Sequence, residues 1–131
     1  MTAKIEKKTD PIKLLLVDDE VGFANVIAKR MSKRNIDVTK AFSGAEALQA
    51  LKKADFEVAV LDLKMEDMDG IEVLKIFKKM DPDLPVIMLT GHGSEEAARE
   101  GIQFGAIDYL MKPCDFEELV QKIIETHRYR G

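Results

Sequence analysis

Short apolar runs along the chain alternate with longer stretches in which apolar residues recur every three or four positions. The short runs occupy residues 12–17, 36–42, 58–61, 85–89 and 107–111, and their length is typical of buried strands. Each run is followed by a stretch with the spacing of a helix face, such as Phe23, Ile27 and Met31, with Val26 alongside, between residues 20 and 34. The pattern therefore predicts five strands alternating with five helices.

The five apolar runs differ in polarity. Runs 12–17, 58–61 and 85–89 are nearly continuous in apolar residues, whereas 36–42 and 107–111 carry polar interruptions. Strands buried on both faces are continuous in this way, and the more polar strands suit the edges of a sheet. Alternation of strand and helix implies right-handed crossovers and parallel pairing. We expect an α/β fold with a doubly wound parallel sheet covered by helices on both faces.

Polar residues mark the helix ends. Ser43 followed by Glu46, and Asp115 followed by Glu118, are capping patterns, and Ser94 is a candidate N-cap for the fourth helix. Gly105 stands where a left-handed residue ends that helix.

The fourth predicted helix, between Ser94 and Phe104, has the weakest composition. Gly101 inside it costs roughly 1 kcal/mol relative to alanine, and the helix offers little apolar surface beyond Ala97, Ala98 and Ile102. Two interpretations of Gly101 stay open. The glycine marks an element that shifts, or it permits close packing.

Composition limits the function classes. The chain has 131 residues with 46% hydrophobic and 34% charged content, which fits one globular domain. We expect a loose lead-in over residues 1–10, a domain over 11–127 and a tail or linker over 128–131. No apolar run approaches the roughly 20 residues of a membrane span, and the net charge of -4 disfavours direct nucleic-acid contact. The single cysteine suits a cytoplasmic protein without disulfides.

Charged and polar residues follow four of the apolar runs. Asp18 and Asp19 follow the first, Asp62 the third, Thr90 the fourth and Lys112 the fifth. Because parallel strands end at the same edge of a sheet, these residues are expected to converge where open α/β sheets bind ligands.

Three clustered carboxylates repel one another and therefore imply a cation, for which oxygen ligands without histidine or thiolate favour Mg²⁺. Asp62 is the best candidate for a nucleophile toward phosphorus, Asp18 and Asp19 for a metal-holding pair, and Lys112 for a second positive charge.

Five motifs in order resemble a response-regulator receiver domain of two-component signalling, the CheY-like family. The resemblance covers residue 12 to about residue 127 and rests on Leu-Leu-Val-Asp-Asp-Glu at 15–20, Leu-Asp-Leu at 61–63, Met-Asp-Gly at 68–70, Leu-Thr-Gly at 89–91 and Gly-Ala-Ile-Asp-Tyr-Leu-Met-Lys-Pro at 105–113. It implies a flavodoxin-like fold with strand order 2-1-3-4-5.

The same resemblance implies the roles of the site residues. Asp62 would accept a phosphoryl group from a sensor histidine kinase or a phosphotransfer protein. Asp19, Asp62 and the backbone carbonyl of Lys64 would bind Mg²⁺ directly, and Asp18 would act through water. Lys112 would pair with the phosphoryl oxygens, and its peptide bond to the following proline would be cis. Such a domain catalyses its own phosphorylation and dephosphorylation and is not an enzyme with a metabolite substrate.

A readout is implied as well. Thr90 would turn its hydroxyl toward the phosphoryl group and Tyr109 would move inward, which changes a surface presented to an effector domain or a downstream protein. Lys64 and His92 would flank the phosphoryl group and set its lifetime. Glu66 stands where many relatives carry proline, so the loop after Asp62 is expected to be less rigid than in those relatives.

Two other functions stay open. One is a Mg²⁺-dependent phosphohydrolase with Asp62 as nucleophile, although a haloacid-dehalogenase-like phosphatase would carry a second aspartate where this chain has Lys64. The other is an interaction module that does not use the site. Neither glycine-rich nucleotide-binding fingerprint is present in the sequence.

Overall fold

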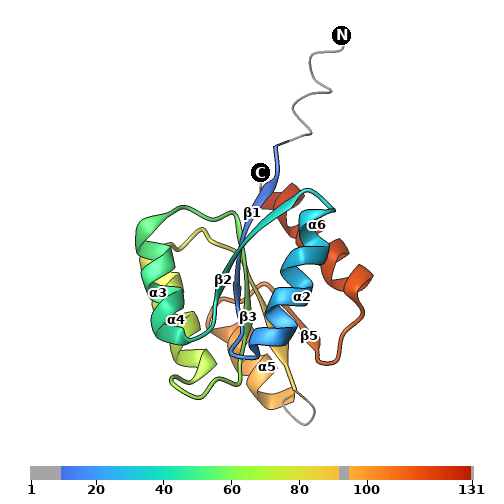
Figure 1. Ribbon diagram of the computed structural model, residues 1–131. Helices are drawn as coiled ribbons and strands as arrows, with labels where there is room; N and C mark the ends of the chain where they lie inside the picture. The colour runs from blue at the N-terminus through green and yellow to red at the C-terminus, as the bar shows by residue number, and fades with distance from the viewer. Residues whose placement is uncertain (1–9, 92–94, 131) are drawn as a thin grey trace.

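A computed structural model of the chain describes residues 10–91 and 95–130. Strands and helices alternate along the chain (Figure 1), in the order β1 (Ile12–Val17), α2 (Val21–Ser32), β2 (Ile36–Ala41), α3 (Gly44–Lys53), β3 (Val58–Asp62), α4 (Gly70–Met80), β4 (Val86–Thr90), α5 (Glu95–Gln103), β5 (Asp108–Met111) and α6 (Phe116–Arg130). The five predicted strands and five predicted helices are all confirmed, with boundaries shifted by a few residues.

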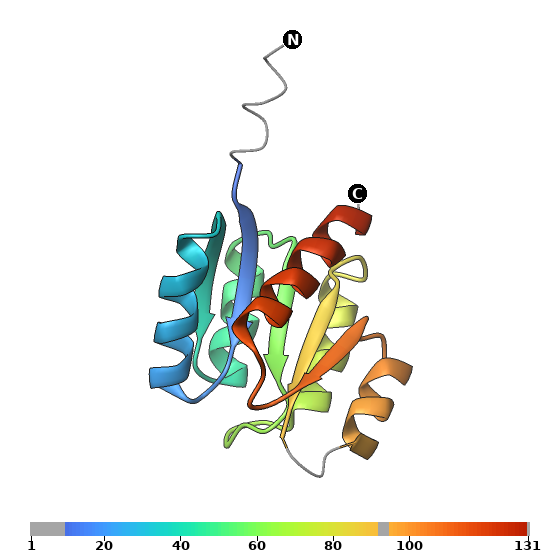
Figure 2. The ribbon, with the colours of Figure 1, turned by 90° about the vertical axis from the view of Figure 1, so that its right-hand side faces the viewer.

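The strands form one parallel sheet in the order β2-β1-β3-β4-β5. This order confirms the flavodoxin-like, doubly wound fold. In Figure 2 the strands run from the end near the N-terminus toward the opposite end, so their carboxyl ends lie together. The interior strands β3 and β4 are fully buried and β1 is buried from Leu14 to Val17, while the edge strands β2 and β5 are partly exposed. The polarity of the runs had predicted this division.

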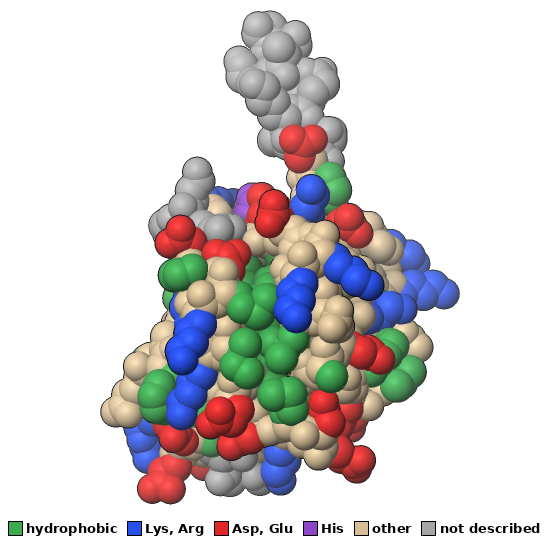
Figure 3. Space-filling view, turned by 90° about the vertical axis from the view of Figure 1, so that its left-hand side faces the viewer, with side chains coloured by type: hydrophobic (Ala, Val, Ile, Leu, Met, Phe, Trp, Pro, Cys, Tyr) green, Lys and Arg blue, Asp and Glu red, His purple; other side chains and the backbone are tan. Residues whose placement is uncertain are grey.

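Two layers of helices cover the sheet, with α2 and α6 on one face and α3, α4 and α5 on the other. Side chains of each strand alternate between the two cores: Leu14 and Leu16 of β1 pack with α2 and α6, whereas Leu15 and Val17 pack with α3 and α4. In Figure 3 the outer surface of the α3 and α4 layer shows hydrophobic side chains between lysine and acidic side chains. The strand period of two therefore builds the two cores from alternate residues of the same strands.

Capping contacts fix several helix ends. The Ser43 side chain accepts a hydrogen bond from the Glu46 amide at the start of α3, as predicted, while the Glu46 carboxylate reaches past the N-cap to the Phe42 amide. The Asp115 carboxylate accepts from the Glu118 amide, which confirms the cap of α6. Gly105 has a φ of 111°, as its predicted left-handed role requires. Ser94 lies outside the described residues.

One helix-face prediction was wrong. Val26 was expected beside Phe23, Ile27 and Met31, but its side chain is 57% exposed. The buried face of α2 is centred on Ala24, Ile27 and Met31, so Val26 lies on the flank that turns away from the sheet.

Helix α6 continues through Arg130, past the domain boundary expected at residue 127. No helix among the described residues is long and apolar enough to cross a membrane.

The parallel sheet brings the carboxyl ends of the interior strands to one edge, where the polar residues predicted for a site are found.

Candidate phosphoryl-acceptor site

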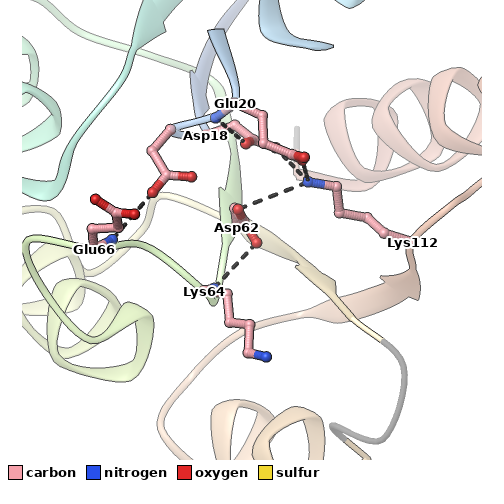
Figure 4. Close-up of polar contacts among 7 residues, drawn as sticks. Asp18, Glu20, Asp62, Lys64, Glu66 and Lys112 are labelled. Atoms are coloured by element: carbon pink, nitrogen blue, oxygen red, sulfur yellow. Dashed lines mark hydrogen bonds and ion pairs between the residues drawn. The ribbon is translucent and has the colours of Figure 1, made fainter. Parts of the chain in front are cut away.

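The predicted site residues meet at the carboxyl edge of the sheet. Asp18 directly follows β1, Asp62 and Thr90 end β3 and β4, and Lys112 directly follows β5. Asp62 and Lys112 border an open pocket of about 500 Å³, whose lining is Asp19, Glu20, Asp62, Lys64, Met65, Glu66, Gly91 and Lys112. The convergence of side chains from separate strands is therefore confirmed (Figure 4).

Three carboxylates form the acidic part of the site. Asp18, Asp19 and Asp62 each place an oxygen within 4.8 Å of the others. Asp18 is fully buried and Asp62 is 4% exposed, whereas Asp19 is half-buried. Oxygen ligands alone, without histidine or cysteine in this cluster, suit a hard divalent cation. The carboxylates present therefore fit the Mg²⁺ site expected from the sequence.

The environment of Asp62 disfavours its charged form. The pKa of Asp62 is raised to about 6: burial raises it most, a hydrogen bond from the Lys64 amide lowers it, Asp18 and Asp19 raise it, and Lys112 lowers it. Burial dominates because the carboxylate loses contact with water at the end of an interior strand. Asp62 is thus a carboxylate whose charge needs a further positive partner.

Lys112 is the cation that the protein itself supplies. Its Nζ lies 2.9 Å from Asp18 Oδ2, 2.6 Å from Glu20 Oε1 and 3.8 Å from Asp62 Oδ2, and it lies 4.5 Å from the centre of the Phe23 ring. Burial by itself would lower the pKa of Lys112, but the hydrogen bonds to Glu20 and Asp18 outweigh burial, so the pKa is raised. The ammonium is therefore charged and held toward the carboxylates.

The backbone around Lys112 is fixed in two ways. Its amide donates to the Thr90 carbonyl at 2.6 Å, which extends the pairing of β4 with β5. The peptide bond between Lys112 and Pro113 is cis, as the resemblance implied. The hydrogen bond to Thr90 holds the Lys112 backbone at the carboxyl end of the sheet.

Thr90 and Tyr109 lie on the neighbouring strands β4 and β5, where Thr90 is paired with Met111 and Tyr109 with Met88. Thr90 is fully buried and its Oγ1 lies at hydrogen-bond distance, 3.1 Å, from Met111 Sδ. Tyr109 is half-buried and packs against the core on the α3 and α4 side of the sheet. The Thr90 hydroxyl therefore has a thioether partner here, and the switch roles of both residues stay predictions.

The residues expected to set the phosphoryl lifetime are only partly placed. Lys64 lines the pocket, but its side chain is exposed and points away from the Asp62 carboxylate (Figure 4). The Lys64 amide is the part that contacts Asp62, at 3.1 Å from Oδ1. Glu66 also lines the pocket, whereas His92 lies outside the described residues.

Three residues with contacts at or beside the site were not predicted from the sequence. Glu20 belongs to a motif that had been noted, yet its ion pair with Lys112 was not expected. Met111 is the partner of the Thr90 hydroxyl. Asp67 accepts hydrogen bonds from the Gly44 amide at 2.9 Å and the Ala45 amide at 3.1 Å. The first of these bonds is the main reason that the pKa of Asp67 is lowered. The strand pattern contains no signal for Asp67, because this contact joins a loop to a distant helix start.

Known proteins share this fold and sequence pattern. A family model described as "Response regulator receiver domain" matches residues 14–124. The chain is 36% identical over 110 residues to "Transcriptional regulatory protein ZraR" of Escherichia coli K12, which covers 84% of this chain and 25% of that protein. This chain thus spans about a quarter of the length of that relative.

Solved structures show the same likeness. The Francisella response regulator 1452 receiver domain has 35% identity and a TM-score of 0.85, and the match covers 92% of this chain and 99% of that one. A CheY-like receiver domain protein from Methanospirillum hungatei JF-1 has 29% identity and a TM-score of 0.87, covering 92% and 96%. Because the family model spans residues 14–124, most of the chain, this chain belongs to the response regulator receiver domain family.

Proposed function

We propose that the protein is a phosphoacceptor receiver in which Asp62 takes a phosphoryl group from a sensor histidine kinase or a phosphotransfer protein. The observation that carries this proposal is the position of Asp62. Its carboxylate is buried at the end of an interior strand, next to two acidic residues and a charged lysine, and borders an open pocket. Membership of the receiver family supports the same role.

In the proposed step a carboxylate oxygen of Asp62 forms a bond to phosphorus. The bond between phosphorus and the donor nitrogen breaks, and its electron pair leaves with that nitrogen, so the product is an acyl phosphate. The Lys64 amide holds Oδ1 of Asp62 and leaves Oδ2 on the side of Lys112, 3.8 Å away. Lys112 is placed to stabilise negative charge that develops on the phosphoryl oxygens.

A divalent cation completes the charge balance. Asp19, Asp62 and the backbone carbonyl of Lys64 are the groups proposed to hold Mg²⁺ directly, with Asp18 acting through water. When bound, Mg²⁺ supplies positive charge that neutralises phosphoryl oxygens. The hydrogen bonds of Asp18 agree with its indirect role, because Oδ1 accepts from the Glu20 amide and Oδ2 accepts from Lys112.

The proposed readout runs from Thr90 to the surface near α5 and β5. The Thr90 hydroxyl leaves Met111 Sδ for a phosphoryl oxygen, and Tyr109 moves into the space near Thr90. Both residues sit on neighbouring strands, so one local change reaches the exposed edge of the sheet. The altered surface is proposed to act on an effector domain or a downstream protein in the cytoplasm, without direct nucleic-acid contact by this segment.

A test with a small phosphodonor separates the three functions considered from the sequence. The chain is incubated with acetyl phosphate and Mg²⁺, and the phosphoryl group on the protein and the phosphate released are measured together. A receiver accumulates one labile phosphoryl group per chain, and accumulation stops with a chelator or in Asp62→Asn. Rapid phosphate release without an adduct would instead support a phosphohydrolase, and neither signal would support an interaction module.

A further inference from the structure

The three carboxylates of the site share one feature: each has an oxygen occupied by a backbone amide. Asp18 Oδ1 accepts from the Glu20 amide at 2.9 Å and Asp62 Oδ1 from the Lys64 amide at 3.1 Å. In each of these two bonds the donor lies two residues after its acceptor in the sequence. The third bond differs, because Asp19 Oδ2 accepts from the Glu66 amide, 47 residues away in sequence, at 3.1 Å.

The segment around Glu66 is attached to a second element on its other side. The next residue, Asp67, accepts hydrogen bonds from the Gly44 and Ala45 amides at the start of α3. Met68 packs closely against Gly44: a β-carbon added to Gly44 would lie 2.7 Å from Met68 Sδ. The Glu66 amide is therefore held between the loop after β1 and the start of α3, and its direction toward Asp19 is fixed.

We propose that the Glu66 amide is a positioning group that makes the site selective for Mg²⁺ over Ca²⁺ by keeping the Asp19 carboxylate a one-oxygen ligand. This inference rests on the Mg²⁺ site of the proposed function. With Oδ2 held by the amide, Asp19 has Oδ1 left for a cation. Mg²⁺ requires compact octahedral coordination, whereas Ca²⁺ takes six to eight oxygen ligands and readily accepts both oxygens of a carboxylate.

The contribution comes from the backbone, so side-chain replacement alone leaves it in place. Glu66→Ala removes the exposed carboxylate and keeps the N–H. Glu66→Pro removes the same carboxylate and also the N–H, since proline has no amide hydrogen. The two variants therefore lose the same charge near the pocket and differ in the hydrogen bond to Asp19, which makes Glu66→Ala the matched control.

The experiment measures the dissociation constants of Mg²⁺ and Ca²⁺ by calorimetry on the full chain without a phosphodonor. In Glu66→Ala both affinities fall together, so their ratio stays within about twofold of the wild-type ratio. In Glu66→Pro the preference for Mg²⁺ shrinks by about tenfold, the scale on which partners of metal ligands act. An equal ratio in the two variants would overturn the proposal.

A measurement on the unaltered chain covers the case in which Glu66→Pro does not fold. The exchange of the Glu66 amide proton is followed by NMR without and with saturating Mg²⁺. The proposal expects the amide to stay protected when the cation binds, and loss of protection would contradict it. If the wild type binds neither cation, the metal site of the proposed function is wrong; if it binds Mg²⁺ and the variants behave alike, only the role of the amide is wrong.

Discussion

Burial of the charged Asp62 carboxylate is unfavourable at neutral pH. The side chain is 4% exposed and shares its surroundings with Asp18 and Asp19. Lys112 and the Lys64 amide offset part of this cost. Burial and the two acidic neighbours still leave the pKa of Asp62 at about 6 instead of 3.8, so the site is arranged for reactivity at the expense of stability.

This raised pKa predicts a pH-dependent gain in stability for Asp62→Asn. A carboxyl group whose pKa is higher in the folded state makes folding less favourable as the pH rises from about 4 to about 6, because the folded chain must then give up a proton that it retains more strongly. The shift from 3.8 to about 6 corresponds to about 3 kcal/mol. Urea denaturation in the presence of a chelator should therefore show that the advantage of Asp62→Asn over the wild type grows between these pH values and then levels off. A difference that stays constant from pH 4 to pH 8 would contradict this explanation.

The strand pattern was sufficient to predict where the side chains of the site lie, because residues that end or follow buried parallel strands lie at the carboxyl edge of the sheet. These residues are Asp18, Asp19, Asp62, Thr90 and Lys112. It was not sufficient for Glu20, Asp67 or the Glu66 amide. Their contacts depend on how two loops fold against each other and against α3. A periodic pattern describes strands and helices, and it carries no information on such loop conformations.

Helix α5 has a weak helical sequence pattern because it contains Gly101, and the same glycine makes a close contact with the sheet. Gly101 was expected either to mark a shifting helix or to permit close packing. A β-carbon at Gly101 would lie 2.1 Å from Met88 Sδ and 2.5 Å from Met88 Cε, and Met88 is fully buried in β4. Close packing against the strand that ends in Thr90 is therefore a sufficient reason for the glycine.

This contact predicts opposite effects for two glycine-to-alanine substitutions in helices. Gly101→Ala gains helix propensity but overpacks against Met88, so the free energy of unfolding should fall by about 1–2 kcal/mol. Gly22 in α2 has no atom within 4 Å of an added β-carbon, so Gly22→Ala should raise the free energy of unfolding by up to about 1 kcal/mol. Denaturant unfolding of both variants measures the difference. Stabilisation by Gly101→Ala equal to that of Gly22→Ala would show that α5 is not packed as closely as the structure has it.

The helix faces were predictable where the pattern was strong. Ile71, Val73, Leu74 and Phe77 of α4 are buried as expected, whereas Val26 of α2 is not. Residue type alone does not distinguish an apolar residue on the buried face of a helix from one on the flank beside that face. Only the direction in which the helix docks on the sheet decides between them.

At the scale of the whole molecule, the fold separates stability from chemistry. Both cores lie between the sheet and its two helix layers, while the charged residues of the site lie at the carboxyl edge of the interior strands. Alternation of strand and helix was enough to predict this architecture, because right-handed crossovers leave few other arrangements. The strand order, which the resemblance supplied, is confirmed by the sheet.

The central claim is that Asp62 carries the phosphoryl group. Reduction of an acyl phosphate with borohydride converts the modified aspartate to homoserine, and peptide mass spectrometry then identifies the position. After treatment with a small phosphodonor and Mg²⁺, we expect homoserine at position 62 and unmodified aspartate at positions 18 and 19. Homoserine at position 18 or 19, or no conversion at position 62 in a chain that has taken up phosphate, would contradict this account of the site.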